Sequence, residues 1–227
     1  MTAYTVFSLV ERSTAQVTGT ELLVVDKPAT GGPVDAAGPM YPVFARLDTR
    51  NLVLPVAAQA ATIIAYHPLM DERAVALTPV GNQVNGSVVS RSLKRVFSEA
   101  SAVRYYLIKD KERNLSGTGC VDVGAPAGTP IVSPVSGVIT GVTEYNLYGK
   151  YPDVQIDIAP DGVGDVTLSL LFVDEPTVKI GLVVVEGKTQ LGKVRAPQGD
   201  LGETLAEFTR DTGSHVHIQV TRGIPGE

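Results

Sequence analysis

The 227-residue sequence is 44% hydrophobic and 19% charged, an ordinary globular composition that excludes a wholly disordered chain. A net charge of -5 and the lack of a basic stripe exclude nucleic acid and an anionic membrane surface as the main partner. The single cysteine, Cys120, excludes a framework of intramolecular disulfides.

The first residues lack both the basic segment of a signal peptide and an apolar run long enough to cross a membrane. We therefore expect a chain without a signal peptide or membrane span, made in the cytoplasm and not exported by the general route. Its length suffices for one large domain or two small ones.

The upstream half reads as short strands, in keeping with a sequence that holds 23 glycines and 15 prolines. A polar run at 109–119 is the best candidate boundary between two units. We predict a β-rich N-terminal domain at 1–112, interpreted as an attachment module, and a second domain at 113–227. The predicted upstream elements are strands at 4–10, 21–25, 43–47, 52–56, 60–66 and 103–108 and a short helix at 92–102.

The downstream half has a more regular pattern of short alternating strands separated by glycine turns. This spacing predicts a compact antiparallel β sandwich or barrel. One helical turn is expected within 202–209, directly before the last strand. The predicted strands fall at 120–123, within 125–142, at 154–158 and 166–172, within 178–193 and at 213–220.

The last strand holds two of the three histidines of the chain. Because side chains alternate along a strand, His215, His217 and Gln219 share one face, and three apolar residues share the other. Two imidazoles so placed can bind zinc, or one can bind it while the other moves protons. A polar rim of the sheet is the alternative at this point.

The third histidine, His67, stands four residues before Asp71, a spacing also found in metal pairs. Pro68 directly after it favours a turn, and the spacing alone is common. We interpret His67 as a turn residue, with a metal ligand as the alternative.

The C-terminal half resembles the LytM/lysostaphin-type zinc metallopeptidase domain, which has a duplicated-hybrid-motif β-sandwich fold. Four segments carry the resemblance in order: 121–131, the glycine turn at 136–139, the paired strands at 178–193, and Gly-Ser-His-Val-His-Ile-Gln-Val at 213–220. Together they span about half of the chain. The resemblance implies a mainly β protein whose C-terminal domain is of this sandwich type.

Members of that family cleave peptidoglycan with zinc. Carried over by position, the resemblance makes Asp122 and His217 metal ligands and His215 a catalytic histidine. Two departures oppose activity: Thr118 stands where the first histidine ligand belongs, and Leu171 stands where a second catalytic histidine belongs. Since a catalytic zinc needs three protein ligands and an open position, we interpret the site as degenerate, with vestigial or weak metal binding.

Two residues offer a third ligand. Cys120 is expected on the same strand face as Asp122, and a thiolate binds zinc well; a half-buried, packed thiol is the alternative. His67 could also reach in from the N-terminal half. We expect no cofactor, or zinc where the site still functions.

The sequence thus favours a non-catalytic structural or docking protein, with other subunits of an assembly as partners. A phage virion or injection apparatus would suit a wall-facing fold without its own export route. The alternatives are a zinc-dependent peptidoglycan endopeptidase, a module that binds peptidoglycan without cleaving it, and a regulator of a separate amidase.

Overall fold

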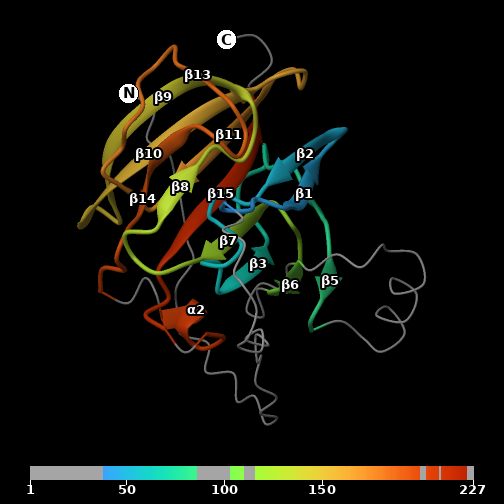
Figure 1. Ribbon diagram of the computed structural model, residues 1–227, viewed down its shortest axis with the longest axis vertical. Coiled ribbons are helices and arrows are strands. Elements are labelled where there is room, and N and C mark those ends of the chain that lie inside the picture. Colours follow the sequence, from blue (N-terminus) through green and yellow to red (C-terminus); the bar gives the residue numbers. More distant parts are fainter. Residues whose placement is uncertain (1–37, 86–102, 110–115, 200–202, 210, 224–227) are drawn as a thin grey trace.

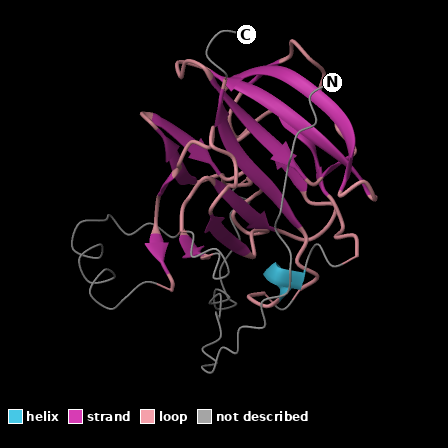
Figure 2. Cartoon of the chain, turned by 180° about the vertical axis from the view of Figure 1, so that it is seen from behind, coloured by secondary structure: helices cyan, strands magenta, loops and turns pink. Residues whose placement is uncertain are grey.

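The computed structural model describes residues 38–85, 103–109, 116–199, 203–209 and 211–223. These residues form a structure that is nearly all β, with one short helix, α2 (Glu203–Ala206), before the last strand (Figures 1 and 2). The prediction of a mainly β protein is confirmed, and so is the helical turn within 202–209. The strands expected at 4–10 and 21–25 and the helix expected at 92–102 lie outside the described residues.

The largest sheet has nine strands in the order β13-β9-β10-β11-β15-β7-β3-β6-β5. Neighbouring strands in it are antiparallel, except that β6 runs parallel to both β3 and β5. The strands are β13 (Val183–Val184), β9 (Gly137–Leu147), β10 (Tyr151–Pro160), β11 (Val166–Leu171), β15 (His215–Arg222), β7 (Cys120–Gly124), β3 (Ile63–His67), β6 (Arg104–Leu107) and β5 (Asn82–Gln83).

Two three-stranded sheets pack on the nine-stranded sheet through a common apolar core. One has the order β2-β1-β4 and the other β12-β14-β8. Ile131 of β8 and Phe44 of β1 are buried in the same cluster as Val216 and Ile218 of β15. The strands are β1 (Val43–Leu47), β2 (Arg50–Val53), β4 (Thr78–Pro79), β8 (Pro130–Val132), β12 (Val173–Asp174) and β14 (Gln190–Val194).

Strand β3, from the upstream half, lies beside β7, from the downstream half, in the same sheet (Figure 1). Gly124 makes this close approach possible, because a Cβ there would lie 2.7 Å from Cγ2 of Ile63. The boundary expected between 112 and 113 falls outside the described residues and stays a prediction. The pairing nevertheless places upstream side chains next to those of β7 and β15.

Among the described residues, no helix is long and apolar enough to cross a bilayer.

Candidate metal centre

Strand β15 presents its two histidines on one face, as the alternation predicted. Val216, Ile218 and Val220 are fully buried in the core, whereas His215 and His217 point to the opposite side of the sheet. Burial of each of these apolar side chains contributes about 1.5–3 kcal/mol, which fixes the register and therefore the face of the histidines.

Strand β7 places Asp122 directly opposite His217. Nδ1 of His217 donates a hydrogen bond to Oδ1 of Asp122 over 2.7 Å. Cys120, two residues earlier on the same strand, shares the face of Asp122 and is fully buried. Two strands thus bring together a carboxylate, an imidazole and a thiol.

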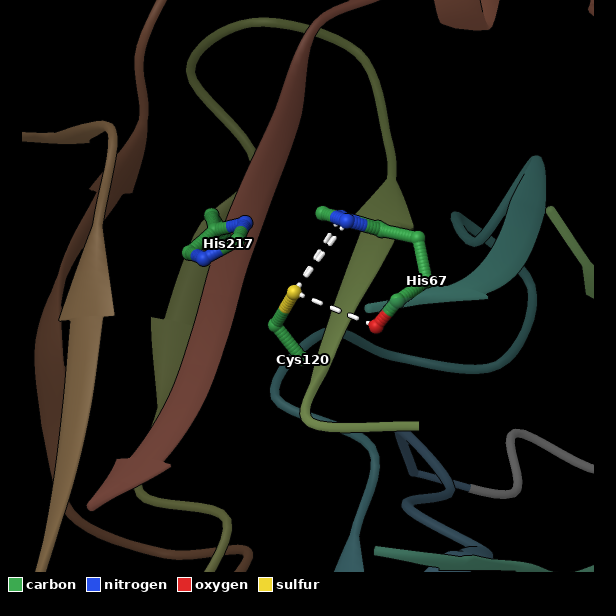
Figure 3. A group of neighbouring side chains, drawn as sticks. All are labelled: His67, Cys120 and His217. Carbon is green, nitrogen blue, oxygen red and sulfur yellow. Dashed lines mark hydrogen bonds between the residues drawn. The ribbon is translucent and has the colours of Figure 1, made fainter. Parts of the chain in front are cut away.

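The third contributor is His67, and here the interpretation as a turn residue was wrong. His67 is the last residue of β3, opposite Cys120, and its side chain is only 9% exposed. Its Nε2 lies 3.1 Å from Oδ2 of Asp122. Its Nδ1 lies 3.1 Å from Sγ of Cys120, and Figure 3 shows these two side chains facing each other. Strand β3 continues up to His67, directly before Pro68, so the imidazole still belongs to the sheet.

Asp71, the carboxylate of the His-x-x-x-Asp motif, pairs with Arg73 and not with His67. Both oxygens of Asp71 accept hydrogen bonds from the guanidinium of Arg73. His67 therefore pairs with Asp122, 55 positions along the chain, and not with the carboxylate four residues away.

The protonation states of Asp122, His67 and Cys120 depend on burial and on the contacts among these side chains. Burial alone would raise the pKa of Asp122, but the nearby His67 and His215 and the hydrogen bond from His217 hold it well below its usual value. Burial would lower the pKa of His67, but Asp122 and Cys120 raise it well above its usual value. Burial raises the pKa of the Cys120 thiol. Without a metal, the cluster therefore holds a carboxylate, an imidazolium and a neutral thiol.

His215 stands beside this group in a supporting place. Its Nδ1 donates to the backbone oxygen of Gly213 over 2.8 Å, which leaves Nε2 facing Oδ1 of Asp122 at 3.9 Å. Burial lowers its pKa, so the ring is neutral near pH 7. A small pocket beside it is lined by Phe172, Arg195, Ala196, Pro197, Ser214 and His215.

Phe172, which sequence reasoning missed, covers the histidines. It follows β11 directly and has a φ of 63°, an unusual backbone conformation for a bulky residue. Its ring lies edge-on to His215 at 4.7 Å and 6.2 Å from the ring of His217. The guanidinium of Arg195 lies over the ring, 5.2 Å from its centroid. No sequence signal marks a phenylalanine for positive φ.

Thr118 and Leu171, the two departures from the family pattern, both have defined contacts in the structure. The hydroxyl of Thr118 donates to the backbone oxygen of Leu77 over 2.6 Å, away from any ligand role. Leu171 is fully buried and pairs with His217 across the sheet. An apolar side chain therefore stands where a proton-transferring group was expected.

Among the described residues, His67, Cys120 and His217 form a group able to hold a metal ion, since their donor atoms all lie within 4.8 Å of one another. Asp122 contacts two members of the group. Nitrogen, sulfur and oxygen donors of these kinds fit zinc.

No family model matches the sequence, and no curated protein matches it. Solved structures are similar at low TM-scores. The catalytic domain of a prophage-encoded M23 protein from Enterococcus faecalis is 20% identical, with 49% of this chain and 73% of that chain covered and a TM-score of 0.35. LytU is 25% identical, with 53% and 71% covered and a TM-score of 0.36.

Lysostaphin is also similar, with 20% identity, 49% of this chain and 39% of that chain covered, and a TM-score of 0.35. A zinc-containing peptidase from Vibrio cholerae is 16% identical, with 80% and 37% covered and a TM-score of 0.36.

Proposed function

We propose that this chain is a non-hydrolytic structural or docking protein built on a LytM-like β fold. The observation that carries the proposal is the apolar pair at the end of β11: Leu171, its last residue, is fully buried opposite His217, and Phe172 packs edge-on against His215. Hydrolysis of a peptide bond needs a polarised water and groups that accept its proton and stabilise the oxyanion. Neither a leucine nor a phenylalanine supplies these.

Access to the centre supports the same proposal. The side chains of His67 and Asp122 are 9% and 13% exposed, and that of His217 is 2% exposed. Both oxygens of Asp122 are already engaged, one by each of these imidazoles. A substrate carbonyl would have to displace the ring of Phe172 and one of these contacts to reach a metal there.

A zinc-dependent peptidoglycan endopeptidase is the alternative, and one observation favours it. His67 supplies a nitrogen donor beside Asp122, so Asp122, His217 and His67 together match the number of protein ligands in a catalytic zinc site. In that case His215 would act as the base toward a metal-bound water. Its neutral state near pH 7 suits that role.

The first experiment separates these two functions. Purified full-length protein, with and without added zinc, is incubated with purified peptidoglycan, and released soluble fragments are measured against a His217→Ala control. We expect no release above the control. Fragment release that requires both zinc and His217 would overturn the proposal in favour of the endopeptidase.

The docking part of the proposal rests on exposed apolar side chains at one end of the large sheet. Strand β13 is the terminal strand there in the described part, and Val183 on it is 66% exposed. Ile180 and Val185 nearby are 65% and 42% exposed. An apolar patch on a sheet edge is typical of a contact with another chain, so the expected partners are other protein subunits of an assembly, such as a virion or injection apparatus.

Native mass measurement tests this part. We expect the full-length protein to associate with itself or with co-purified subunits of a particle, and Val183→Lys to weaken that association. Asp174→Lys, at another exposed site on the terminal strand β12 of a different sheet, serves as the matched control. A strictly monomeric protein that is absent from isolated particles would contradict the docking role. Retention on purified peptidoglycan without fragment release would instead support a wall-binding role.

A further inference from the structure

We infer that His67, Cys120, Asp122 and His217 form a closed, four-ligand zinc site that joins the upstream strand β3 to β7 and β15. Two of these four, His67 and Cys120, lie outside the ligand pattern that the resemblance implies. The inference deepens the proposed function, because a closed site stabilises structure and leaves no coordination position for a reacting water.

The register of three adjacent strands places the four donors on one face. His217 lies opposite Asp122 across the β15–β7 pair, and His67 lies opposite Cys120 across the β7–β3 pair. Cys120 and Asp122 are two positions apart on the central strand, so both point to the same side. The backbone of all four residues is therefore fixed by the hydrogen bonds of the sheet, and none of the four lies in a loop.

The donor atoms lie close enough together to share one metal ion. Donor atoms 2.0–2.3 Å from zinc lie roughly 3.3 to 3.6 Å from one another. Here Nε2 of His67 lies 3.1 Å from Oδ2 of Asp122 and 3.5 Å from Sγ of Cys120, and Nδ1 of His217 lies 2.7 Å from Oδ1 of Asp122. On metal binding the two contacts of Asp122 would lengthen. The ring of His67, whose Nδ1 lies 3.1 Å from Sγ of Cys120, would turn so that Nε2 faces the ion.

The donor set also balances the charge of the ion. A thiolate and a carboxylate together carry two negative charges, and two neutral imidazoles carry none, so a bound Zn²⁺ leaves a buried site with no net charge. A neutral site avoids the cost of an uncompensated charge in the protein interior. Nδ1 of His67 then remains 3.3 Å from the backbone oxygen of Pro68, the kind of contact that orients a metal-bound imidazole.

The third histidine is excluded from the set by its own contacts. Nδ1 of His215 is engaged by Gly213, and its Nε2 lies 3.9 Å from Asp122 on the side covered by Phe172. The structure thus separates two ligand histidines from one supporting histidine. Substituting a ligand histidine should therefore weaken metal binding, whereas substituting His215 should not.

The test measures metal content and the spectrum of the cobalt-substituted full-length protein. We expect one zinc per chain and, after exchange, the charge-transfer absorption of a thiolate bound to tetrahedral Co²⁺. Cys120→Ser should abolish this absorption. His67→Gln should weaken metal binding by more than the roughly 10- to 100-fold typical of losing a group that only orients a ligand. His215→Gln, the matched control, should keep both stoichiometry and spectrum.

Protection of Cys120 gives a second reading on the unmutated protein, in case a variant fails to fold. The thiol should resist alkylation with zinc bound and react faster after chelation. Absence of zinc and of any cobalt spectrum, cobalt bound without the thiolate absorption, or a spectrum unchanged in His67→Gln would each overturn the site. None of these outcomes depends on peptidoglycan. A protein that binds zinc at the four-ligand site but still cleaves peptidoglycan would overturn only the proposed function. A protein that neither cleaves peptidoglycan nor binds zinc would overturn only the metal site.

Discussion

Nε2 of His67 lies 3.1 Å from Oδ2 of Asp122, although 55 positions separate the two residues in the sequence. The contact joins β3 to β7, two neighbouring inner strands of the nine-stranded sheet. It places a nitrogen atom of a neighbouring strand beside the carboxylate of Asp122.

The first prediction concerns the stability that this contact provides in metal-free protein. His67→Ala leaves the Asp122 carboxylate in a site where its side chain is 13% exposed, with one partner fewer. Removing one member of a buried ion pair costs about 3–5 kcal/mol, and the residual exposure of both side chains favours the lower end, about 3 kcal/mol. Urea denaturation in the presence of a chelator measures the free energy of unfolding.

Arg73→Gln is the matched control for this measurement. The Arg73–Asp71 pair is closer, at 2.8 Å against 3.1 Å, but its side chains are 34% and 26% exposed. A partly exposed pair contributes up to about 1 kcal/mol, so the loss should be clearly smaller. Equal losses in the two variants would show that the His67–Asp122 contact is not a buried pair.

Much of this site could be predicted from the sequence because it depends on local alternation. The face shared by His215 and His217, and the face shared by Cys120 and Asp122, follow directly from the two-residue period of a strand. The absence of donors at Thr118 and Leu171 required only their side-chain chemistry. The mainly β fold followed from the spacing of short strands and glycine turns.

The place of His67 could not be predicted in this way. Its role depends on β3 pairing with β7, and no local pattern encodes which distant strand becomes a neighbour. One signal was present: residues 60–66 are almost all apolar, and a strand buried on both faces needs partners on both sides. Phe172 was missed for a different reason, since its position follows from a positive φ that tertiary contacts impose.

The second prediction concerns Leu171. Leu171→His restores the residue type that the resemblance expects, but it places a polar ring in a fully buried position. We expect a loss of about 2–4 kcal/mol in the free energy of unfolding and no release of peptidoglycan fragments, because the ring of Phe172 still covers the centre. Leu170→His, one residue earlier in the apolar core, is the control for destabilisation alone. Zinc-dependent fragment release by Leu171→His alone would contradict a closed centre.

The third prediction uses the backbone of Phe172. Both Phe172→Ala and Phe172→Gly lose the packing of the ring against His215 and Arg195. Because φ is 63°, alanine keeps a conformational strain that glycine avoids, so the glycine variant should be the more stable of the two by about 1 kcal/mol. At Leu168, inside β11, the order should reverse, with glycine the less stable by roughly 0.5–1 kcal/mol. The same order at both positions would mean that the backbone at 172 is unstrained.

The fourth prediction concerns pH and the carboxyl group of Asp153, which is only 4% exposed. Burial raises its pKa above the ordinary value near 3.8, although the hydrogen bond from Tyr145 and the charge of Arg195 oppose the shift. Between the ordinary pKa and the raised one, the folded protein binds more protons than the unfolded chain. Stability therefore falls as the pH rises through this window and levels off above it.

Asp153→Asn removes this titration while keeping the shape of the side chain. The stability of the wild type relative to the variant should decrease as the pH is raised from below 3.8 through the folded pKa, as measured by urea denaturation at a series of pH values. Asp71→Asn is the control of opposite sign, because the hydrogen bonds from Arg73 lower the pKa of Asp71. The stability of the wild type relative to Asp71→Asn should decrease as the pH falls and increase as the pH rises. Parallel slopes in the two comparisons would show that Asp153 is ionised more readily in the folded protein than in the unfolded chain, and that Arg195 and Tyr145 outweigh its burial.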